Sequence, residues 1–302
     1  MKRTEPLEMY QPTSLKEASQ LLKVNGAGGR FLAGGTDLVI AMKEKGLLPK
    51  YIVDLKRIPG LAGIRENGDG NISIGALTTM REIEISPLIK TKYPFLAQSA
   101  AEVGSIQIRN RATVGGNMAN ATPSADVAPT LIALDASAKI VGANGERSLA
   151  LEGFFRGPGQ TSMGADEILT EIIIPKAAPR LVGEYIKFSP REMMDLAYVG
   201  VAVAYELTGD KRCKGVRIVL GAVAPTPIRA KKAEAALEGQ VLTEALADKI
   251  GEIAAEESKP ISDVRSSAEY RRAMVGAMTK RAILNAAAGQ AKSWVERRDR
   301  RY

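Results

Sequence analysis

The chain of 302 residues contains no histidine and a single cysteine, Cys213. Catalysis by a Ser–His or Cys–His pair is therefore excluded, because no imidazole is present to act as the base. One thiol forms no disulfide framework, and zinc and iron–sulfur clusters prefer several nitrogen or sulfur ligands. We expect neither a catalytic side chain nor a metal site, so that the chemistry resides in a bound cofactor positioned by the protein.

Long apolar runs are also missing, and no segment approaches the length of a membrane span. Residues 1–6 lack the apolar core of a signal peptide. The composition, 45% hydrophobic and 25% charged, is typical of a soluble globular protein. We expect a cytoplasmic protein without a membrane span, long enough for two or three domains.

The formal net charge is +8, but the positive charge is not gathered on one element that could read nucleic acid. The densest basic run is Arg297–Arg301, near the C-terminus. We interpret this run as a solvated tail or as a contact for an acidic partner, and we expect no nucleic acid.

Residues 106–126 are dense in small and hydrogen-bonding side chains, and their second half shows little helical or strand periodicity. Gly115-Gly116 lacks side chains, so two backbone N–H groups can approach a ligand closely. Thr113 and Asn117 add side-chain donors nearby. Long loops without structure of their own are usually functional or disordered, and the apolar flanks argue against disorder. The stretch indicates binding of phosphate oxygens.

A second stretch of the same character lies at residues 31–38, where an apolar run ends in Gly34-Gly35. Thr36 or Asp37 can cap the helix that follows, and a strand, a glycine turn and a helix start together form an anion site. The spacing matches neither the Rossmann fingerprint nor the Walker loop. Two such loops predict a ligand with two phosphates held between them.

Apolar periodicity and turn signals predict a mixed α+β chain. The N-terminal part has the pattern of a small β-α-β-α-β unit. The elements predicted up to residue 174 are helices at 14–26, 37–45, 79–84, 94–103 and 127–134, strands at 31–33, 51–55 and 169–174, and hairpins at 63–75 and 138–149.

Lys176–Pro179 is the predicted domain boundary. Beyond it, three strand-like runs precede three helical patterns, at 185–188, 197–207, 215–223, 230–237, 243–256 and 266–288. We predict a C-terminal domain in which a three-stranded antiparallel sheet is backed by a helical bundle.

The residues Ala33–Leu38 and Thr113–Asn117 together resemble the FAD-binding (medium) subunit of the molybdenum hydroxylases. This family includes the carbon monoxide dehydrogenase medium subunit and the FAD domain of xanthine dehydrogenase. The resemblance continues through Pro123–Pro129 and Gly221–Ala230 and covers nearly the whole chain.

The resemblance implies a two-subdomain FAD-binding fold of the vanillyl-alcohol-oxidase type. The domains that we expect are residues 1–56, 57–176 and a C-terminal domain at 177–290, followed by a basic tail at 291–302.

The family implies that both Gly-Gly loops contact the FAD pyrophosphate, that Ile108 and Arg109 lie beside the flavin or adenine, and that Asp126 accepts from the ribityl hydroxyls. It also places an aromatic and a basic residue near the isoalloxazine ring, here Tyr185 and Lys187. The resemblance thus implies these cofactor-binding residues: Ala33, Gly34, Gly35, Thr36, Asp37, Leu38, Ile108, Arg109, Thr113, Gly115, Gly116, Asn117, Ser124, Asp126, Tyr185 and Lys187.

Each of these residues also has a purely structural interpretation. The glycines can form plain turns, and Asp126 can cap the helix that begins at residue 127. Arg109 can form an ordinary surface ion pair, Tyr185 can be a core tyrosine, and Lys187 can be a lysine with a buried stem and an exposed head. Asp195 matches a family position and is interpreted as structural.

As a whole, the resemblance implies an electron-transfer subunit that carries FAD within a molybdenum-containing hydroxylase or dehydrogenase. Its expected partners are a large subunit with the molybdenum cofactor, a small subunit with [2Fe–2S] clusters, and an external electron acceptor. A stand-alone flavin oxidoreductase of the same fold is the alternative, weakened by the lack of histidine near flavin N5. A non-catalytic nucleotide-binding regulator is a third hypothesis.

Overall fold

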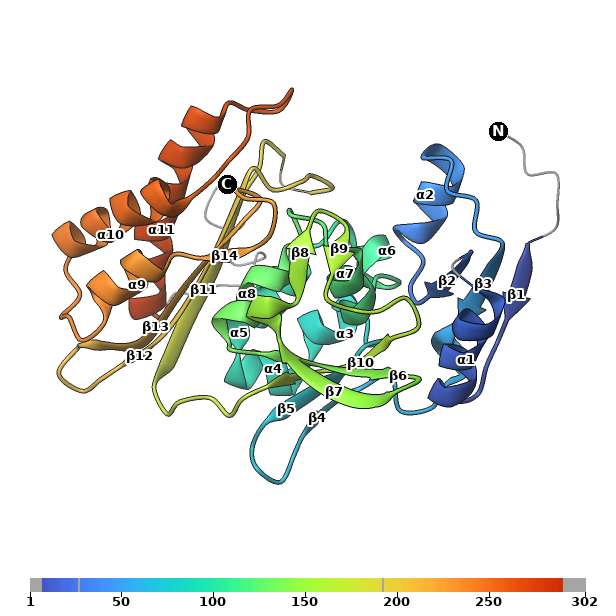
Figure 1. Cartoon of the computed structure of the whole chain (residues 1–302). Coiled ribbons are helices and arrows are strands. Elements are labelled where there is room, and N and C mark those ends of the chain that lie inside the picture. The colour runs from blue at the N-terminus through green and yellow to red at the C-terminus, as the bar shows by residue number, and fades with distance from the viewer. Residues whose placement is uncertain (1–6, 27, 192, 290–302) are drawn as a thin grey trace.

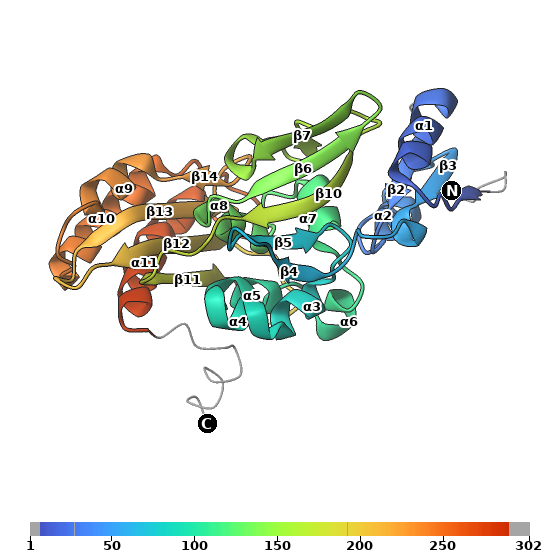
Figure 2. The same ribbon diagram turned by 90° about the horizontal axis from the view of Figure 1, so that it is seen from below.

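The computed structural model describes residues 7–26, 28–191 and 193–289. Along the chain these form an N-terminal unit (residues 7–57), a middle unit (58–177) and a C-terminal unit (181–289), as the colours of Figure 1 show. The middle unit lies between the other two in both views (Figures 1 and 2). The fold is a mixture of helices and strands, as predicted.

The N-terminal unit is a three-stranded parallel sheet in the order β1-β3-β2. Its central strand is buried at every residue, as expected for a parallel strand with neighbours on both sides. Ser14 caps the first helix by accepting a hydrogen bond from the Glu17 amide, and Gly26, at φ 77°, ends it. The elements are β1 (Glu8–Tyr10), α1 (Leu15–Asn25), β2 (Gly29–Leu32), α2 (Leu38–Glu44), β3 (Tyr51–Asp54) and η1 (Leu55–Arg57).

The middle unit contains a five-stranded antiparallel sheet in the order β4-β5-β10-β6-β7. A small hairpin, β8-β9, follows the sheet's β6-β7 ribbon. Its strands and short helical turn are β4 (Ile64–Glu66), β5 (Ile72–Gly75), β6 (Ser137–Gly142), β7 (Gly145–Ala150), η2 (Leu151–Gly153), β8 (Phe155–Gly157), β9 (Gln160–Thr161) and β10 (Ile168–Ile174).

Six short helices belong to the same unit, and two of them correct the sequence analysis. The stretch 106–126, predicted to be a long loop, contains α6 and α7, because Ser105 and Thr113 each cap a turn of helix. The helices are α3 (Met80–Ile85), α4 (Pro87–Lys92), α5 (Pro94–Ala101), α6 (Ile106–Arg109), α7 (Val114–Asn120) and α8 (Val127–Ala133).

The C-terminal unit is a sheet in the order β11-β12-β13-β14 with three helices. The three predicted strands are present. A fourth, β14, has only two residues, too few for a recognisable strand pattern, and pairs with β13 after the Pro225–Pro227 turn. The elements are β11 (Leu181–Phe188), β12 (Val199–Leu207), β13 (Cys213–Gly221), β14 (Ile228–Arg229), α9 (Lys231–Leu237), α10 (Glu244–Glu257) and α11 (Ala268–Ala287).

The C-terminal sheet is covered on both faces. Tyr185, Ala202, Ala204 and Val219 belong to the core of the middle unit, where α8 packs against β12 and β13 and α5 against β11. The alternate residues of these strands join the core formed with α9, α10 and α11. The sheet is therefore the wall that joins the middle unit to the C-terminal helices.

None of the described helices is long and apolar enough to span a membrane. The cytoplasmic location stays a prediction, as does the basic tail at 291–302, which lies outside the described residues.

The packing of α10 on α11 depends on a small residue. A Cβ added to Gly251 would lie 2.5 Å from the carbonyl oxygen of Gly276 in the facing helix. We predict that Gly251→Ala lowers the free energy of unfolding by about 1–3 kcal/mol, because the helices must move apart. Urea unfolding measures this change.

The matched control is Gly68→Ala, because no atom lies within 4 Å of the added Cβ at this turn position. We expect the control to change the free energy of unfolding by no more than about 0.5 kcal/mol. Equal losses in the two variants would contradict the role of the helix contact.

Candidate FAD site

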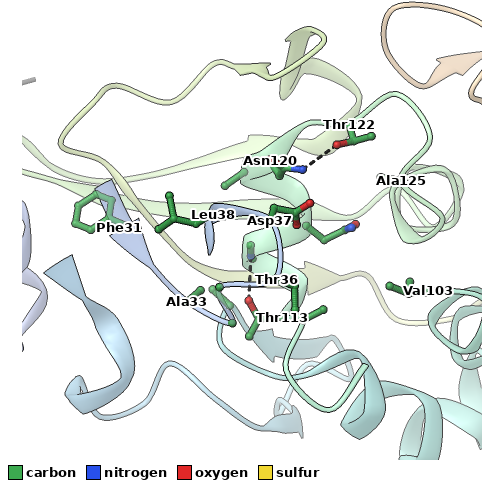
Figure 3. Close-up of a pocket in the computed structure, with 18 of the residues that line it drawn as sticks. Phe31, Ala33, Thr36, Asp37, Leu38, Val103, Thr113, Asn120, Thr122 and Ala125 are labelled. Carbon is green, nitrogen blue, oxygen red and sulfur yellow. Dashed lines mark hydrogen bonds between the residues drawn. The ribbon is translucent and has the colours of Figure 1, made fainter. Parts of the chain in front are cut away.

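A cavity of about 690 Å³ lies between the N-terminal and middle units, and a loop of the C-terminal unit reaches its wall. Figure 3 shows Phe31, Ala33, Thr36, Asp37 and Leu38 on one side and residues of the middle unit facing them. The predicted site residues that line it are Ala33, Gly34, Gly35, Thr36, Asp37, Leu38, Ile108, Thr113, Gly115, Gly116, Asn117, Ser124 and Asp126.

The first Gly-Gly pair connects β2 to α2, and its two glycines serve different purposes. A Cβ on Gly34 would lie 1.9 Å from the carbonyl oxygen of Arg111, so only glycine lets the N-terminal unit rest on the middle unit here. Gly35 has φ 81°, a left-handed conformation that glycine adopts without strain. Asp37 is at the N-cap of α2, but its side chain makes no capping hydrogen bond.

The second pair is the first turn of α7. Thr113 caps this helix, since its Oγ1 accepts a hydrogen bond of 3.1 Å from the Gly116 amide (Figure 3). A Cβ on Gly115 would lie 2.6 Å from the Cβ of Ala76, which forces glycine at that position. A Cβ on Gly116 would be 3.8 Å from the Cβ of Ala33. The two predicted loops, far apart in sequence, therefore meet across the cavity.

Several polar groups of the cavity wall suit a ligand rich in oxygen atoms. The Oδ1 atom of Asn117 is buried and has no hydrogen-bond partner within the part of the chain that the structure describes. An unpaired buried acceptor is costly, so a ligand hydroxyl or amide that donates to it stabilises the site. Asn120 donates to the Thr122 hydroxyl at 2.8 Å and lies on the same wall (Figure 3).

Asp126 lies at the boundary of the cavity and the C-terminal unit, and its side chain is only 8% exposed. Its Oδ1 accepts a hydrogen bond from the Tyr185 hydroxyl at 2.9 Å, and its Oδ2 accepts one from Lys187 Nζ at 3.0 Å. Burial raises the pKa of the Asp126 carboxyl, and the Lys187 ammonium opposes that rise. Asp126 precedes α8 but makes no side-chain capping bond, so the helix-capping interpretation is wrong.

Three predicted residues do not reach the cavity wall. Tyr185 and Lys187 are turned to Asp126, and burial raises the pKa of the Tyr185 hydroxyl well above its ordinary value. Arg109 is buried in an ion pair with Glu84 at 2.7 Å. Their contact with a cofactor stays a prediction that the geometry does not favour.

The sequence analysis missed several lining residues, among them Ala76, Leu169 and the loop at 194–196. Met194 has φ 56°, and its amide donates to the Gly104 carbonyl at 3.4 Å, which draws the loop toward the middle unit. Among the residues that the structure describes, the Asp195 side chain bonds only Arg191 and the Leu196 amide of its own loop, in line with its structural interpretation. No motif marks Ala76 or Leu169, and the family position at Asp195 is interpreted as structural, because tertiary packing alone brings this loop to the cavity.

The sequence matches the model of the FAD binding domain in molybdopterin dehydrogenase over residues 5–177. It also matches the CO dehydrogenase flavoprotein C-terminal domain over residues 184–286. The chain belongs to the family of FAD-binding subunits of molybdenum hydroxylases. It is an oxidoreductase subunit, and its cofactor is FAD, as the resemblance implied.

Named relatives of this FAD subunit cover almost its whole length. It is 36% identical to the carbon monoxide dehydrogenase medium chain of Hydrogenophaga pseudoflava over 280 residues, 93% of this chain and 96% of the relative. It is 32% identical to the xanthine dehydrogenase FAD-binding subunit of Escherichia coli O157:H7 over 280 residues, 92% of this chain and 95% of the relative.

Solved structures are also similar to this chain over nearly its whole length. A chain of the H. pseudoflava carbon monoxide dehydrogenase that lacks the Mo-pyranopterin moiety superposes with a TM-score of 0.90 at 36% identity, covering 96% of this chain and 99% of that chain. A chain of quinoline 2-oxidoreductase from Pseudomonas putida 86 superposes with a TM-score of 0.88 at 30% identity, covering 96% of this chain and 100% of that one.

The contact at Gly34 tests the assignment of FAD to this cavity. We predict that Gly34→Ala raises the dissociation constant for FAD at least about tenfold, because the new methyl group pushes the Gly34-Gly35 segment away from Arg111 and Ala112, which precede α7. A titration of the apo-chain with FAD, followed by flavin fluorescence, measures the constant.

The control is Gly153→Ala, whose added Cβ meets only Leu149, at an ordinary 3.8 Å. Its FAD affinity is expected to remain at the wild-type value. If Gly34→Ala folds and binds FAD as the wild type does, the pyrophosphate is not held where these segments meet.

Proposed function

We propose that this FAD subunit takes electrons from iron–sulfur clusters of a partner subunit and passes them to an external acceptor. The partners would be a large subunit with the molybdenum cofactor and a small subunit with [2Fe–2S] clusters. The observation that carries the proposal is the meeting of the two Gly-Gly segments, Gly34-Gly35 and Gly115-Gly116, in one cavity. That cavity belongs to a chain whose described residues contain no cluster of metal-ligating side chains.

The division of labour agrees with the composition. No histidine and one buried cysteine leave this chain without ligands for either metal centre of such a complex. The names of its relatives, medium chains and FAD-binding subunits, support the same arrangement. The chain thus supplies the flavin site, and its partners supply the metals.

Residues of the cavity would suit the pyrophosphate and the ribityl chain of the cofactor. We expect both Gly-Gly segments to contact the pyrophosphate. The Gly115 amide already donates to the Ala76 carbonyl at 2.8 Å and the Gly116 amide to Thr113 Oγ1 at 3.1 Å, so the amides of Gly34-Gly35 would be the donors and the second pair would only permit close approach. The Thr113 and Ser124 hydroxyls would bond phosphate or ribityl oxygens, and Asp126 would accept from the ribityl hydroxyls. When bound, FAD supplies one- and two-electron transfer, and these residues orient it and exclude water.

The fold and domain assignments belong to the same proposal. We assign residues 1–56 and 57–176 to a two-subdomain FAD-binding fold of the vanillyl-alcohol-oxidase type, and residues 177–290 to the C-terminal domain. Three groups of buried apolar residues, each centred in one unit, support this division. The middle group extends onto one face of β11, β12 and β13, and the N-terminal group includes Ile168 of β10.

Affinity purification of the complex from its native source, through a tag on this chain, tests the proposal. We expect two further subunits to co-purify. For each FAD subunit the complex should contain about one FAD, one molybdenum and four iron atoms, since two [2Fe–2S] clusters hold four irons. Reduction of the flavin by substrate is expected in the complex and not in the isolated chain.

Two other outcomes point to different functions. If the isolated chain turns over a substrate with bound FAD and no partner, it is a stand-alone flavin oxidoreductase. If it carries no flavin and binds none when FAD is added, the cavity belongs to a nucleotide-binding regulator. Either result overturns the proposed electron-transfer role.

A further inference from the structure

A groove lies between α10 and α11, which pack at the end of the molecule opposite the N-terminal unit (Figures 1 and 2). Its volume is about 460 Å³, and it shares no lining residue with the flavin cavity. Its apolar lining consists of small residues, Ala255 on α10 and Ala273, Gly276 and Ala277 on α11. The contact with Gly251 accounts for Gly276, but Ala273 and Ala277 are exposed and leave the groove open to solvent.

The charged side chains in and beside this groove are mostly acidic. Five carboxylates are present, four of them recurring every fourth residue and so sharing one face of α10: Glu244, Asp248, Glu252 and Glu256, with Glu269 on α11. The two basic residues are Arg272 and Lys280, which leaves a net charge of −3. Lys280 pairs with Glu244 and Asp248, whereas the exposed Glu252 side chain has no ion pair or hydrogen bond among the described residues.

The chain continues after α11 with residues of the opposite charge. Residues 290–302 contain five basic and two acidic side chains, a net charge of +3, and they include Trp294, the one tryptophan of the sequence. The matched C-terminal family domain ends at residue 286. The family resemblance therefore assigns no role to this segment, although its charge complements that of the groove.

The segment begins within reach of the groove. Gly289, at φ 63°, ends α11 in a left-handed conformation that changes the direction of the chain. Ala277 precedes Gly289 by twelve residues, or about 18 Å of helix. Trp294 follows Gly289 by five residues, which span about 17 Å when extended. A chain that returns along α11 thus brings the indole ring to the apolar lining.

The next residues of the segment would then follow the acidic face of α10. The two helices are antiparallel, because Lys280 lies beside Glu244 and Gly276 beside Gly251. A returning chain therefore passes α10 from its N-terminal to its C-terminal end, with the basic run after the tryptophan. Because the segment is tethered next to the groove, its effective concentration is high and modest contacts suffice to hold it.

We propose that residues 290–302 fold back into the groove between α10 and α11. Trp294 occupies the apolar lining, where burial of a large aromatic side chain is favourable, and Arg297–Arg301 face the carboxylates of α10. The acidic partner of the basic run is then this chain itself. A groove filled in this way is closed to other subunits, so a partner docks elsewhere on the chain. The proposal does not depend on the flavin site.

Fluorescence of the flavin-free full-length chain tests the proposal, because Trp294 alone supplies the tryptophan signal. We expect emission at a shorter wavelength than in the same chain unfolded by urea, and no change on dilution. Ala277→Gln fills the apolar lining without a change of charge and should shift the emission toward that of the unfolded chain. Glu252→Lys should lower the equilibrium constant for docking about threefold, because it replaces an exposed attraction with a repulsion.

Two variants outside the groove are matched controls. Ala245 is an exposed alanine of α10 that does not line the groove, and Ala245→Gln repeats the change made at Ala277. Glu44 is an exposed carboxylate of α2 without an ion pair among the described residues, and Glu44→Lys repeats the charge reversal. Both controls should keep the wild-type emission, and circular dichroism should show the same helix content in all four variants.

Three results would overturn the proposal. Wild-type emission equal to that of the urea-unfolded chain means that the tryptophan remains in water. Equal emission in the groove variants and their controls means that it packs on another surface. A short-wavelength emission that is lost on dilution means that the segment binds the groove of a second copy of this chain.

Discussion

The close approach of two backbone segments is the constraint on which the site depends. Gly34 lies so near the Arg111 carbonyl that no other residue fits, and Gly115 meets Ala76 in the same way. Because the Gly34 contact is with backbone rather than with a flexible side chain, the distance between the N-terminal and middle units is set by atoms that cannot rotate away, whereas the Gly115 contact fixes the start of α7 within the middle unit. The cavity is therefore a consequence of how the two units pack.

The polar groups around this contact differ in how many hydrogen-bond partners they have within the protein. The Thr113 hydroxyl oxygen accepts a hydrogen bond in capping α7, whereas the Asn117 Oδ1 atom lacks a partner within the described residues. Asp126 stands between these cases, with two donors from β11 and spare lone pairs. The site thus combines polar groups that fix the backbone conformation with polar groups whose remaining hydrogen bonds a ligand can supply.

Sequence reasoning found the parts of the site that depend on local chemistry. Gly34-Gly35 and Gly115-Gly116 are recognisable because glycine is needed for backbone geometry, and they do lie together. The periodicity of α6 and α7 escaped detection because these helices are too short and too rich in small residues to show an apolar face. The approach of the Met194 loop to the cavity and the Tyr185–Asp126 contact arise from the docking of distant segments, which a local sequence pattern does not predict.

Strand β12 belongs to two cores at once. Ala202 and Ala204 face the middle unit, while Val201, Val203 and Tyr205 face the C-terminal helices. Small residues alternate with large ones because one neighbour is a tightly packed helix and the other a deep apolar layer. Substitutions on either face of this strand disturb a packed core, so the strand is a poor site for inserting new residues in protein engineering. The mostly exposed turn at 208–212, which connects β12 to β13, is a suitable site.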